Sequence, residues 1–212
     1  MNKSTTELTV EYIQEHPYIK NCLKKNLINY SSLARLISKD LKIEKKSSKE
    51  AILIAARRFQ YKLKAELNNE KKIKVILIKS EISIKNKIGV LILNKSTDLD
   101  YLIELQKNVK KEEGIMHVLE GTDNYTIITQ ERYILKLYEK FENNIIKSHE
   151  NLVIIDFKSP EEIEKITGVI SYLTSLFAEN GVNILEFLSC WRDTIFVIDK
   201  KDINKAIDLL NF

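Results

Sequence analysis

The sequence predicts an α+β fold in which an all-α helical domain precedes two ferredoxin-like βαββαβ modules. Up to about residue 67 the apolar residues recur only at helical spacing. After Lys72 the pattern changes to apolar strand runs that alternate with amphipathic helices, and the order βαββα then occurs twice. Repeated units of this kind, each about 65 residues long, are typical of the split βαβ arrangement.

Residues 1–67 are expected to form the helical domain. Three short helices are predicted, over residues 8–16, 18–27 and 33–37. Ser47, with Glu50 three residues later, predicts a capping box that opens a fourth, longer helix to about Glu66. The buried stripe of this helix is expected to contain Ile52, Ala55, Ala56, Phe59 and Leu63.

The first module is expected over residues 72–150, after a polar boundary from Leu67 to Lys71. The apolar run Lys74–Ile78 and the alternating segment Glu81–Lys85 predict one or two strands that end in a turn at Asn86-Lys87. The remaining strands are predicted at 88–93, 115–120, 125–129 and 145–146. The two helices are predicted at 99–109, capped by Ser96, and at 134–141.

The second module is expected over residues 151–212. Its strands are predicted at 152–157, 183–188 and 194–198, and its helices at 169–180 and after Asp199. This copy lacks a closing strand, and we hypothesise that the strand predicted at 73–78 supplies the missing edge.

The second module resembles an ACT domain. The resemblance is carried by two segments, Thr167-Gly168-Val169-Ile170-Ser171-Tyr172-Leu173-Thr174-Ser175-Leu176 and Glu179-Asn180-Gly181-Val182-Asn183-Ile184. The whole chain resembles a family of archaeal proteins predicted to regulate amino-acid metabolism through an ACT domain. That family usually has proline before the turn glycine, whereas this chain has Thr167.

The resemblance implies that a small effector, an amino acid, binds beside the turn that precedes the first helix of the module. A glycine at this turn lets backbone amides approach a carboxylate, and the helix N-terminus adds partial positive charge. Carried over residue by residue, the expected ligand-binding residues are Thr167, Gly168, Val169, Ile170, Asn183 and Ile184. The first module has no glycine at the equivalent turn and is expected to be structural, and the protein is expected to be a homodimer.

A different arrangement around Gly168 stays open at this point. The sequence Ser159-Pro160-Glu161-Glu162 predicts a capping box, and an apolar stripe continues beyond it through Ile163, Ile166 and Ile170. Residues 160–180 could therefore form one helix with Gly168 in its interior, at a cost of about 1 kcal/mol relative to alanine. Because that cost needs a compensating reason, a short helix, a glycine turn and a second helix are the preferred prediction.

The N-terminal third is basic, with 14 Lys and Arg against 8 Asp and Glu in residues 1–70, whereas the whole chain has a net charge of +4. This balance fits DNA contact through a helix-turn-helix formed by Ser31–Ile37 and Ser48–Tyr61. The candidate DNA-binding residues are Arg35, Lys39, Lys42, Lys49, Arg57, Arg58 and Tyr61. A generic helical bundle with a Lys-rich solubilising surface remains the alternative. The apolar Ile54, opposite the buried stripe, suits a protein contact at least as well.

No motif indicates catalysis. The patterns GxGxxG, GxSxG and HExxH do not occur, and the three histidines, His16, His117 and His149, have no metal-ligand spacing, so no catalytic residue, metal or cofactor is expected. Two cysteines without a CxxC pair predict a reducing compartment, and no apolar run is long enough for a membrane span or a secretory signal.

The predicted protein is therefore a cytoplasmic, non-enzymatic regulator of amino-acid metabolism. It is expected to bind an amino acid and to transmit this binding to a DNA- or protein-binding head. The alternatives are a dimerisation adaptor that binds no ligand and docks a metabolic enzyme, and an enzyme with an unrecognised site.

Overall fold

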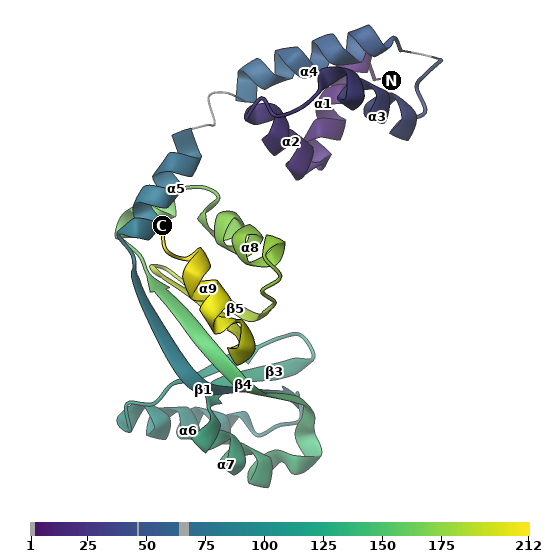
Figure 1. The fold of residues 1–212 in the computed structure, drawn as a ribbon. Coiled ribbons are helices and arrows are strands. Elements are labelled where there is room, and N and C mark those ends of the chain that lie inside the picture. The colour runs from purple at the N-terminus through teal and green to yellow at the C-terminus, as the bar shows by residue number, and fades with distance from the viewer. Residues whose placement is uncertain (1–2, 46, 64–67) are drawn as a thin grey trace. The chain divides into compact units, whose positions relative to one another are not determined.

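The computed structural model describes residues 3–45, 47–63 and 68–212 of the chain (Figure 1). The chain divides into two compact units, residues 1–71 and 72–212. In the first unit the described residues form helices α1 (Thr5–Glu15), α2 (Pro17–Lys24), α3 (Tyr30–Asp40) and α4 (Lys49–Leu63). The second unit contains an antiparallel sheet with helices, so the predicted α+β class is confirmed. None of the described helices is long and apolar enough to cross a membrane.

The helices of the first unit enclose one hydrophobic core. The predicted stripe of α4 is buried as expected, with Ile52 and Ala56 at its centre. The expected capping box at Ser47 and Glu50 is wrong. The Ser48 hydroxyl accepts a hydrogen bond from the Ala51 N–H at 3.1 Å, while the Ser47 hydroxyl is 2.7 Å from that of Thr5. The predicted end of this helix, at Glu66, lies outside the described residues.

Helix α5 (Asn68–Ile78) corrects the predicted strand at 74–78. Ile73, Ile76 and Leu77 are buried at the i, i+3 and i+4 positions of a helix, whereas Val75 and Ile78 are exposed. Periodicity over five apolar residues cannot distinguish a buried strand from a helix. Here packing of one helical face against the sheet decides the conformation.

Strand β1 (Glu81–Asn94) is one element of 14 residues and not two strands separated by a turn. Lys87 adopts a left-handed conformation with φ of 58°, and the register with strand β4 shifts between Lys85 and Ile88. An extra residue in an antiparallel strand bends the strand without reversing it. The polar Asn86-Lys87 pair therefore marks a β-bulge.

The remaining elements of the sheet follow the predicted order. They are α6 (Leu99–Lys111), β2 (Met116–Glu120), β3 (Asn124–Gln130), α7 (Glu131–Phe141), the 3₁₀ turn η2 (Glu142–Asn144), β4 (Ile145–Lys158), the 3₁₀ segment η3 (Glu161–Lys165), α8 (Val169–Glu179), β5 (Ile184–Cys190), β6 (Asp193–Asp199), the 3₁₀ turn η4 (Lys200–Asp202) and α9 (Ile203–Leu209). The expected cap of α6 is corrected, since Asp98 and not Ser96 accepts the hydrogen bond from the Tyr101 N–H.

The six strands lie in the order β2-β3-β1-β4-β6-β5. Each half of the sheet therefore has the same pattern, in which the second, third and first strand of that half follow one another from the edge to the centre. The central strands β1 and β4 have 14 residues each and pair along most of their length. Residues 88–94 of β1 pair with β3, and residues 81–85 extend beyond β3 to pair with residues 154–158 of β4. The strand that lies beside residues 154–158 is therefore 81–85, not the predicted 73–78.

Helices pack on the two halves of this sheet and form separate cores. Leu91 and Leu93 of β1 contribute to the core beneath α6 and α7. Ile155 and Phe157 of β4 contribute to the core that includes α5, α8 and α9. The alternate residues of both strands, Ile88 among them, belong to a third buried cluster. Figure 1 shows β1 and β4 passing from one group of helices to the other.

Gly168 interrupts the chain between η3 and α8. It has φ of 91° and ψ of 5°, a left-handed conformation, at the N-cap position of α8. The preferred prediction of a short helix, a glycine turn and a second helix is confirmed, and a continuous helix over residues 160–180 is excluded.

Replacing Gly168 by alanine tests this conformation. Gly168→Ala should lower the free energy of unfolding by about 1–2 kcal/mol, because a left-handed conformation costs a Cβ-bearing residue that much. Space is available, since the nearest atom to a Cβ would be Ile73 Cδ1 at 3.6 Å. In a helix interior the same change would instead raise stability by about 1 kcal/mol. Urea unfolding of the variant and the wild type shows whether the free energy of unfolding falls or rises.

Gly181→Ala is the matched control for this experiment. Gly181 has φ of 69° and no atom within 4 Å of an added Cβ, so its replacement should destabilise the protein to a similar extent. A stabilising Gly168→Ala beside a destabilising Gly181→Ala would contradict the glycine turn.

The carboxyl of Asp156 in β4 provides a second test. Burial raises the pKa of Asp156, and its Oδ1 is buried without a hydrogen-bond partner among the described residues. A folded-state pKa above the unfolded value means that stability is lost as the pH rises through it. Asp156→Asn should therefore raise the Tm at about pH 7 by a few degrees, and less at about pH 4. Asp123→Asn, in the exposed β2–β3 turn, should change little at either pH. A lower Tm for Asp156→Asn at neutral pH would show that its contact with Lys85, 3.9 Å away, dominates.

Candidate functional site

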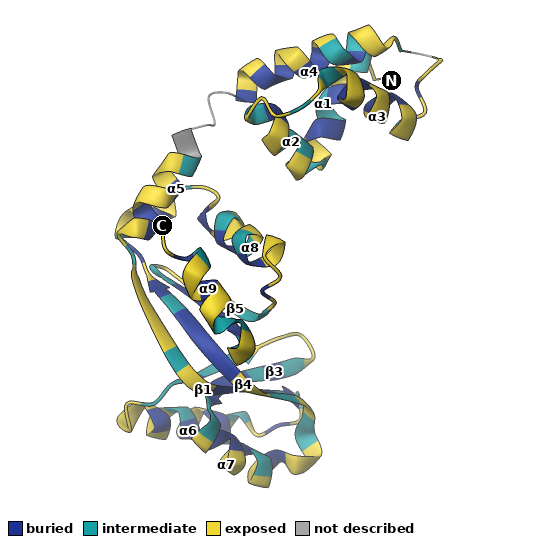
Figure 2. Ribbon diagram, viewed as in Figure 1, coloured by how far each residue is buried: buried dark blue, intermediate teal, exposed yellow. Residues whose placement is uncertain are grey.

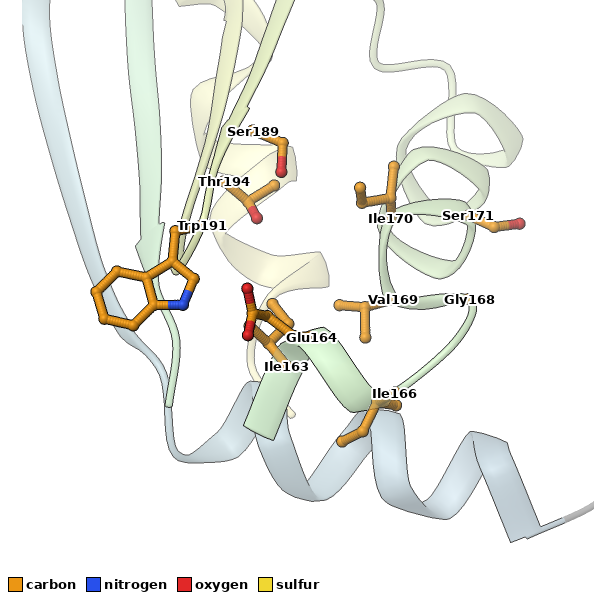
Figure 3. A pocket seen from close by; sticks show the side chains of 10 residues that line it. All are labelled: Ile163, Glu164, Ile166, Gly168, Val169, Ile170, Ser171, Ser189, Trp191 and Thr194. Atoms are coloured by element: carbon orange, nitrogen blue, oxygen red, sulfur yellow. The ribbon is translucent and has the colours of Figure 1, made fainter. Parts of the chain in front are cut away.

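A pocket of about 350 Å³ lies at the N-terminus of α8 (Figure 3). Its walls come from η3, from the first turn of α8 and from the β5–β6 hairpin. The lining residues are Ile163, Glu164, Ile166, Gly168, Val169, Ile170, Ser171, Ser189, Trp191 and Thr194.

The N-terminus of α8 presents backbone amides at this pocket. The first N–H groups of a helix have no partner within the helix and usually receive one from a capping side chain. Gly168 occupies the cap position without such a side chain, and no side-chain cap bond is formed. The amides of the first turn and the helix dipole therefore make the α8 end of the pocket electropositive.

Thr194 supplies a polar group on the facing wall. The residue is 2% exposed and is one of those that line the pocket. Figure 3 shows the hydroxyl of Thr194 directed into the pocket, on the side of the sheet that faces Ile170. A hydroxyl both donates and accepts hydrogen bonds, so it can bond to a polar atom of a ligand in the pocket.

Glu164 and Trp191 give the pocket a negative charge and an aromatic wall. Both side chains are exposed, and Figure 3 shows the Glu164 carboxylate between Trp191 and Val169. Cations are attracted to carboxylates and to the faces of aromatic rings. The pocket thus combines an electropositive end with a negatively charged side.

The hairpin that carries Trp191 is fixed to the rest of the pocket. The Ser159 N–H donates to the Arg192 carbonyl at 2.9 Å, and Arg192 Nε donates to the Ser159 carbonyl at 2.6 Å. The Ser159 hydroxyl, in a residue 1% exposed, lies 2.9 Å from that of Ser80. The expected capping box at Ser159 is therefore wrong, since η3 has no side-chain cap and Ser159 instead anchors the hairpin.

The structure brings together three of the six predicted ligand-binding residues. Gly168, Val169 and Ile170 line the pocket, and the exposed Thr167 directly precedes it without lining it. Asn183 and Ile184 follow the other end of α8, which has 11 residues and is therefore about 16 Å long. Asn183 is exposed, and Ile184 packs against the core, so these two residues do not face Gly168.

The local sequence patterns do not indicate the wall opposite α8. Because β5 starts near the C-terminus of α8, only the end of β5 and the start of β6 return to its N-terminus. Ser189, Trp191 and Thr194 lie there. A signal was present in the sequence, since Trp191 is the single tryptophan of the chain and stands in a hairpin tip.

The equivalent turn in the first half of the sheet is closed by its own side chains. Asp98 caps α6, and the Asn144 amide donates to Asn94 Oδ1 and to the Ser96 hydroxyl, each at 2.9 Å. A second pocket, of about 260 Å³, lies instead between α6 and α7, where it is lined by Asn108, Glu112 and Tyr133 among others. An uncapped helix N-terminus therefore faces a pocket at α8 but not at α6.

In the first unit, the candidate DNA-binding residues are all exposed, as is Ile54. Arg57 stacks over the ring of Tyr30 at 5.2 Å, and Arg35 donates to the Ser32 hydroxyl at 3.1 Å. Between α3 and α4 lie residues 41–48, a longer interval than the three or four residues of a common helix-turn-helix. Within the described parts of both units, no group of three or more His, Cys, Asp or Glu could hold a metal ion.

Comparisons with known proteins identify an ACT domain in the second unit. A family model described as ACT domain matches residues 147–211. No curated protein matches the sequence.

Similar solved structures include an aspartate kinase and regulatory parts of aspartate kinases. A putative C-terminal regulatory domain from Porphyromonas gingivalis is 10% identical, with a TM-score of 0.46, and the match covers 62% of this chain and 94% of that one. The regulatory subunit from Thermus thermophilus is 6% identical, with a TM-score of 0.46 and coverages of 61% and 92%. The aspartate kinase of Clostridium acetobutylicum is 14% identical, with a TM-score of 0.49; 61% of this chain is matched, but only 33% of that enzyme. The segment that matches the ACT domain model, residues 147–211, contains the α8 pocket.

Proposed function

We propose that this chain is a non-enzymatic, cytoplasmic regulator of amino-acid metabolism that binds an amino acid in the pocket at the N-terminus of α8. The observation that carries the proposal is the meeting, in one pocket, of a helix N-terminus without a side-chain cap and the hydroxyl-bearing Thr194 on the facing wall. The match of the surrounding segment to the ACT domain family supports a regulatory role.

The charges around the pocket complement a zwitterion. The amides of Val169, Ile170 and Ser171 would bind the α-carboxylate, since helix N-termini favour anions. The Glu164 carboxylate would bind the α-ammonium group, and Thr194 would bond to either polar group. A volume of about 350 Å³ lies within the range of small-molecule sites.

The sheet supports an arrangement of two ACT-type modules that share their central strands. Residues 88–94 with α6, β2, β3, α7 and residues 145–149 would form the first module. Residues 152–158 with α8, β5, β6, α9 and residues 81–85 would form the second. The first module would be structural, because Asp98 already satisfies the N-terminus of its first helix.

Helix α5 offers a route for transmitting effector binding. Ile73 Cδ1 of α5 is the nearest atom to a Cβ built on Gly168, at 3.6 Å, and Ile76 and Leu77 continue into the same core. The N-terminal end of α5 belongs to the first unit by sequence. An effector that prefers one arrangement of the Gly168 turn would also favour one position of α5, which is the requirement for coupling two sites.

Thermal-shift measurements with each of the twenty amino acids test the ligand proposal. One of them should stabilise the protein by about 2.7 kcal/mol at a hundredfold excess over its Kd. Thr194→Val should weaken the affinity for that amino acid about five- to tenfold, because one hydrogen bond is lost while the shape is kept. Thr122→Val, in the exposed β2–β3 turn, is the matched control and should leave the shift unchanged. Stabilisation by none of the twenty would favour the adaptor that binds no ligand.

DNA binding by the first unit is the activity that we propose the effector regulates. Its exposed cations on α3 and α4, Arg57 and Arg58 among them, support it. The chain should bind mixed-sequence duplex DNA with an affinity that falls as salt rises, and the double variant Arg57→Ala/Arg58→Ala should weaken binding at least tenfold and flatten the salt dependence. Lys200→Ala/Lys201→Ala in the second unit is the control. A chain that does not bind DNA even at low salt would indicate that the head docks a protein, for which the half-exposed Ile54 is the first candidate contact.

A further inference from the structure

The first five residues of β1, Glu81–Lys85, form an open edge of the sheet. They pair with β4 on one side, but β3 occupies the other side only from Ile88 onward. Glu81, Ile82, Ser83 and Ile84 are all exposed, and Figure 2 shows this part of β1 exposed along the margin of the sheet. No backbone hydrogen bond within the described chain joins the free side of these residues to another element.

This edge carries apolar side chains at alternate positions. Ile82 and Ile84 lie opposite Phe157 and Ile155 of β4, which are buried in the core beneath α8. The two isoleucines therefore extend the row of core side chains to the margin of the sheet, where they remain 39% and 37% exposed. Natural proteins protect open edges, and an exposed apolar edge is suited to pairing with another strand.

We propose that a second copy of this chain pairs with this edge, antiparallel and centred on Ser83. In this register, Ile82 lies opposite Ile84 of the partner subunit, and Glu81 lies opposite Lys85 of the partner subunit. Two-fold symmetry repeats both contacts, so the interface contains two Ile–Ile pairs and two Glu–Lys pairs. The result is one continuous sheet of twice six strands.

A neighbouring register and a second open stretch of the central strands lack this complementarity. Centring the pair on Ile84 would place Ile82 opposite Asn86 of the partner subunit and Ser83 opposite Lys85 of the partner subunit. A second open stretch, residues 146–150 of β4, fails in the same way, because its self-pairing about Ser148 would place Ile146 opposite Glu150 and Lys147 opposite His149. Of these two stretches of the central strands, the distribution of charge and apolar side chains favours Glu81–Lys85, in the register centred on Ser83.

The size of the surface sets the expected strength of the dimer. Five residues of strand cover less than the area of a standard interface, and the exposed Val75 and Ile78 of α5, just before the strand, are the nearest apolar extension in sequence. We therefore expect a reversible dimer that weakens with salt, since its charge pairs are exposed.

Sedimentation equilibrium of the full chain over a concentration series tests the interface. The wild type should be a monomer–dimer system. Glu81→Lys and Lys85→Glu should each raise the Kd of the dimer about tenfold or more, because each places like charges opposite one another twice. An equimolar mixture of the two variants should recover dimers of wild-type strength, because both charge pairs are then restored in the mixed dimer.

Lys147→Glu, in the open stretch of β4, is the matched control and should leave the Kd unchanged. Circular dichroism checks folding. If Lys85→Glu fails to fold because its contact with Asp156 is lost, the dimer Kd values of Glu81→Lys and Ile84→Asn test the interface without it. A wild type that is monomeric at about 100 μM, a Kd unaffected by Glu81→Lys, or no recovery in the mixture of folded variants would overturn the proposal.

Discussion

The pairing of β1 with β4 is the constraint on which the second unit depends. Both strands have 14 residues, and each serves both halves of the sheet. Each also contains a left-handed residue near its middle, Lys87 in β1 and Asn151 in β4, where the register between them shifts. The bulges adjust the alternation of side chains, so that each half of a strand presents apolar residues to its own helices. Without these two irregularities, one half of each strand would direct its apolar residues away from the core.

Within this frame, the two halves differ in one detail that decides where a ligand could bind. At the start of α6, Asp98 accepts a hydrogen bond from the Tyr101 N–H, and Asn94, Ser96 and Asn144 form a hydrogen-bond network in the preceding turn. At the start of α8, the equivalent position is a glycine, and a hydroxyl on β6 faces it across a pocket. The same fold thus contains one closed and one open helix N-terminus. A difference of this kind lies in a few side chains and leaves the strand order unchanged.

The sequence predicted most elements of the second unit because their periodicities are long and regular. The helices around Leu137 and Leu173 and the strands around Ile127 and Val197 occur where expected. The strand predicted at 74–78 is wrong, because a short continuous apolar run shows neither helical nor strand periodicity. Only tertiary packing makes this segment helical. Only the α8 side of the pocket was predicted. Gly168 is visible in the sequence as a break in an apolar stripe, but Thr194 and Trp191 reach it only through the return of the β5–β6 hairpin, which local patterns do not encode.

The shared central strands mean that no single cut in the chain separates the two halves of the sheet. A fragment beginning at Asn151 would keep β5, β6 and most of β4 but would leave Ile155 and Phe157 without the neighbouring residues of β1. A fragment that ends at Asn151 would lack the residues of β4 that pair with residues 81–85 of β1. Residues 72–212 should therefore unfold as one cooperative body. An insertion or deletion in either central strand would disturb the packing of both sets of helices.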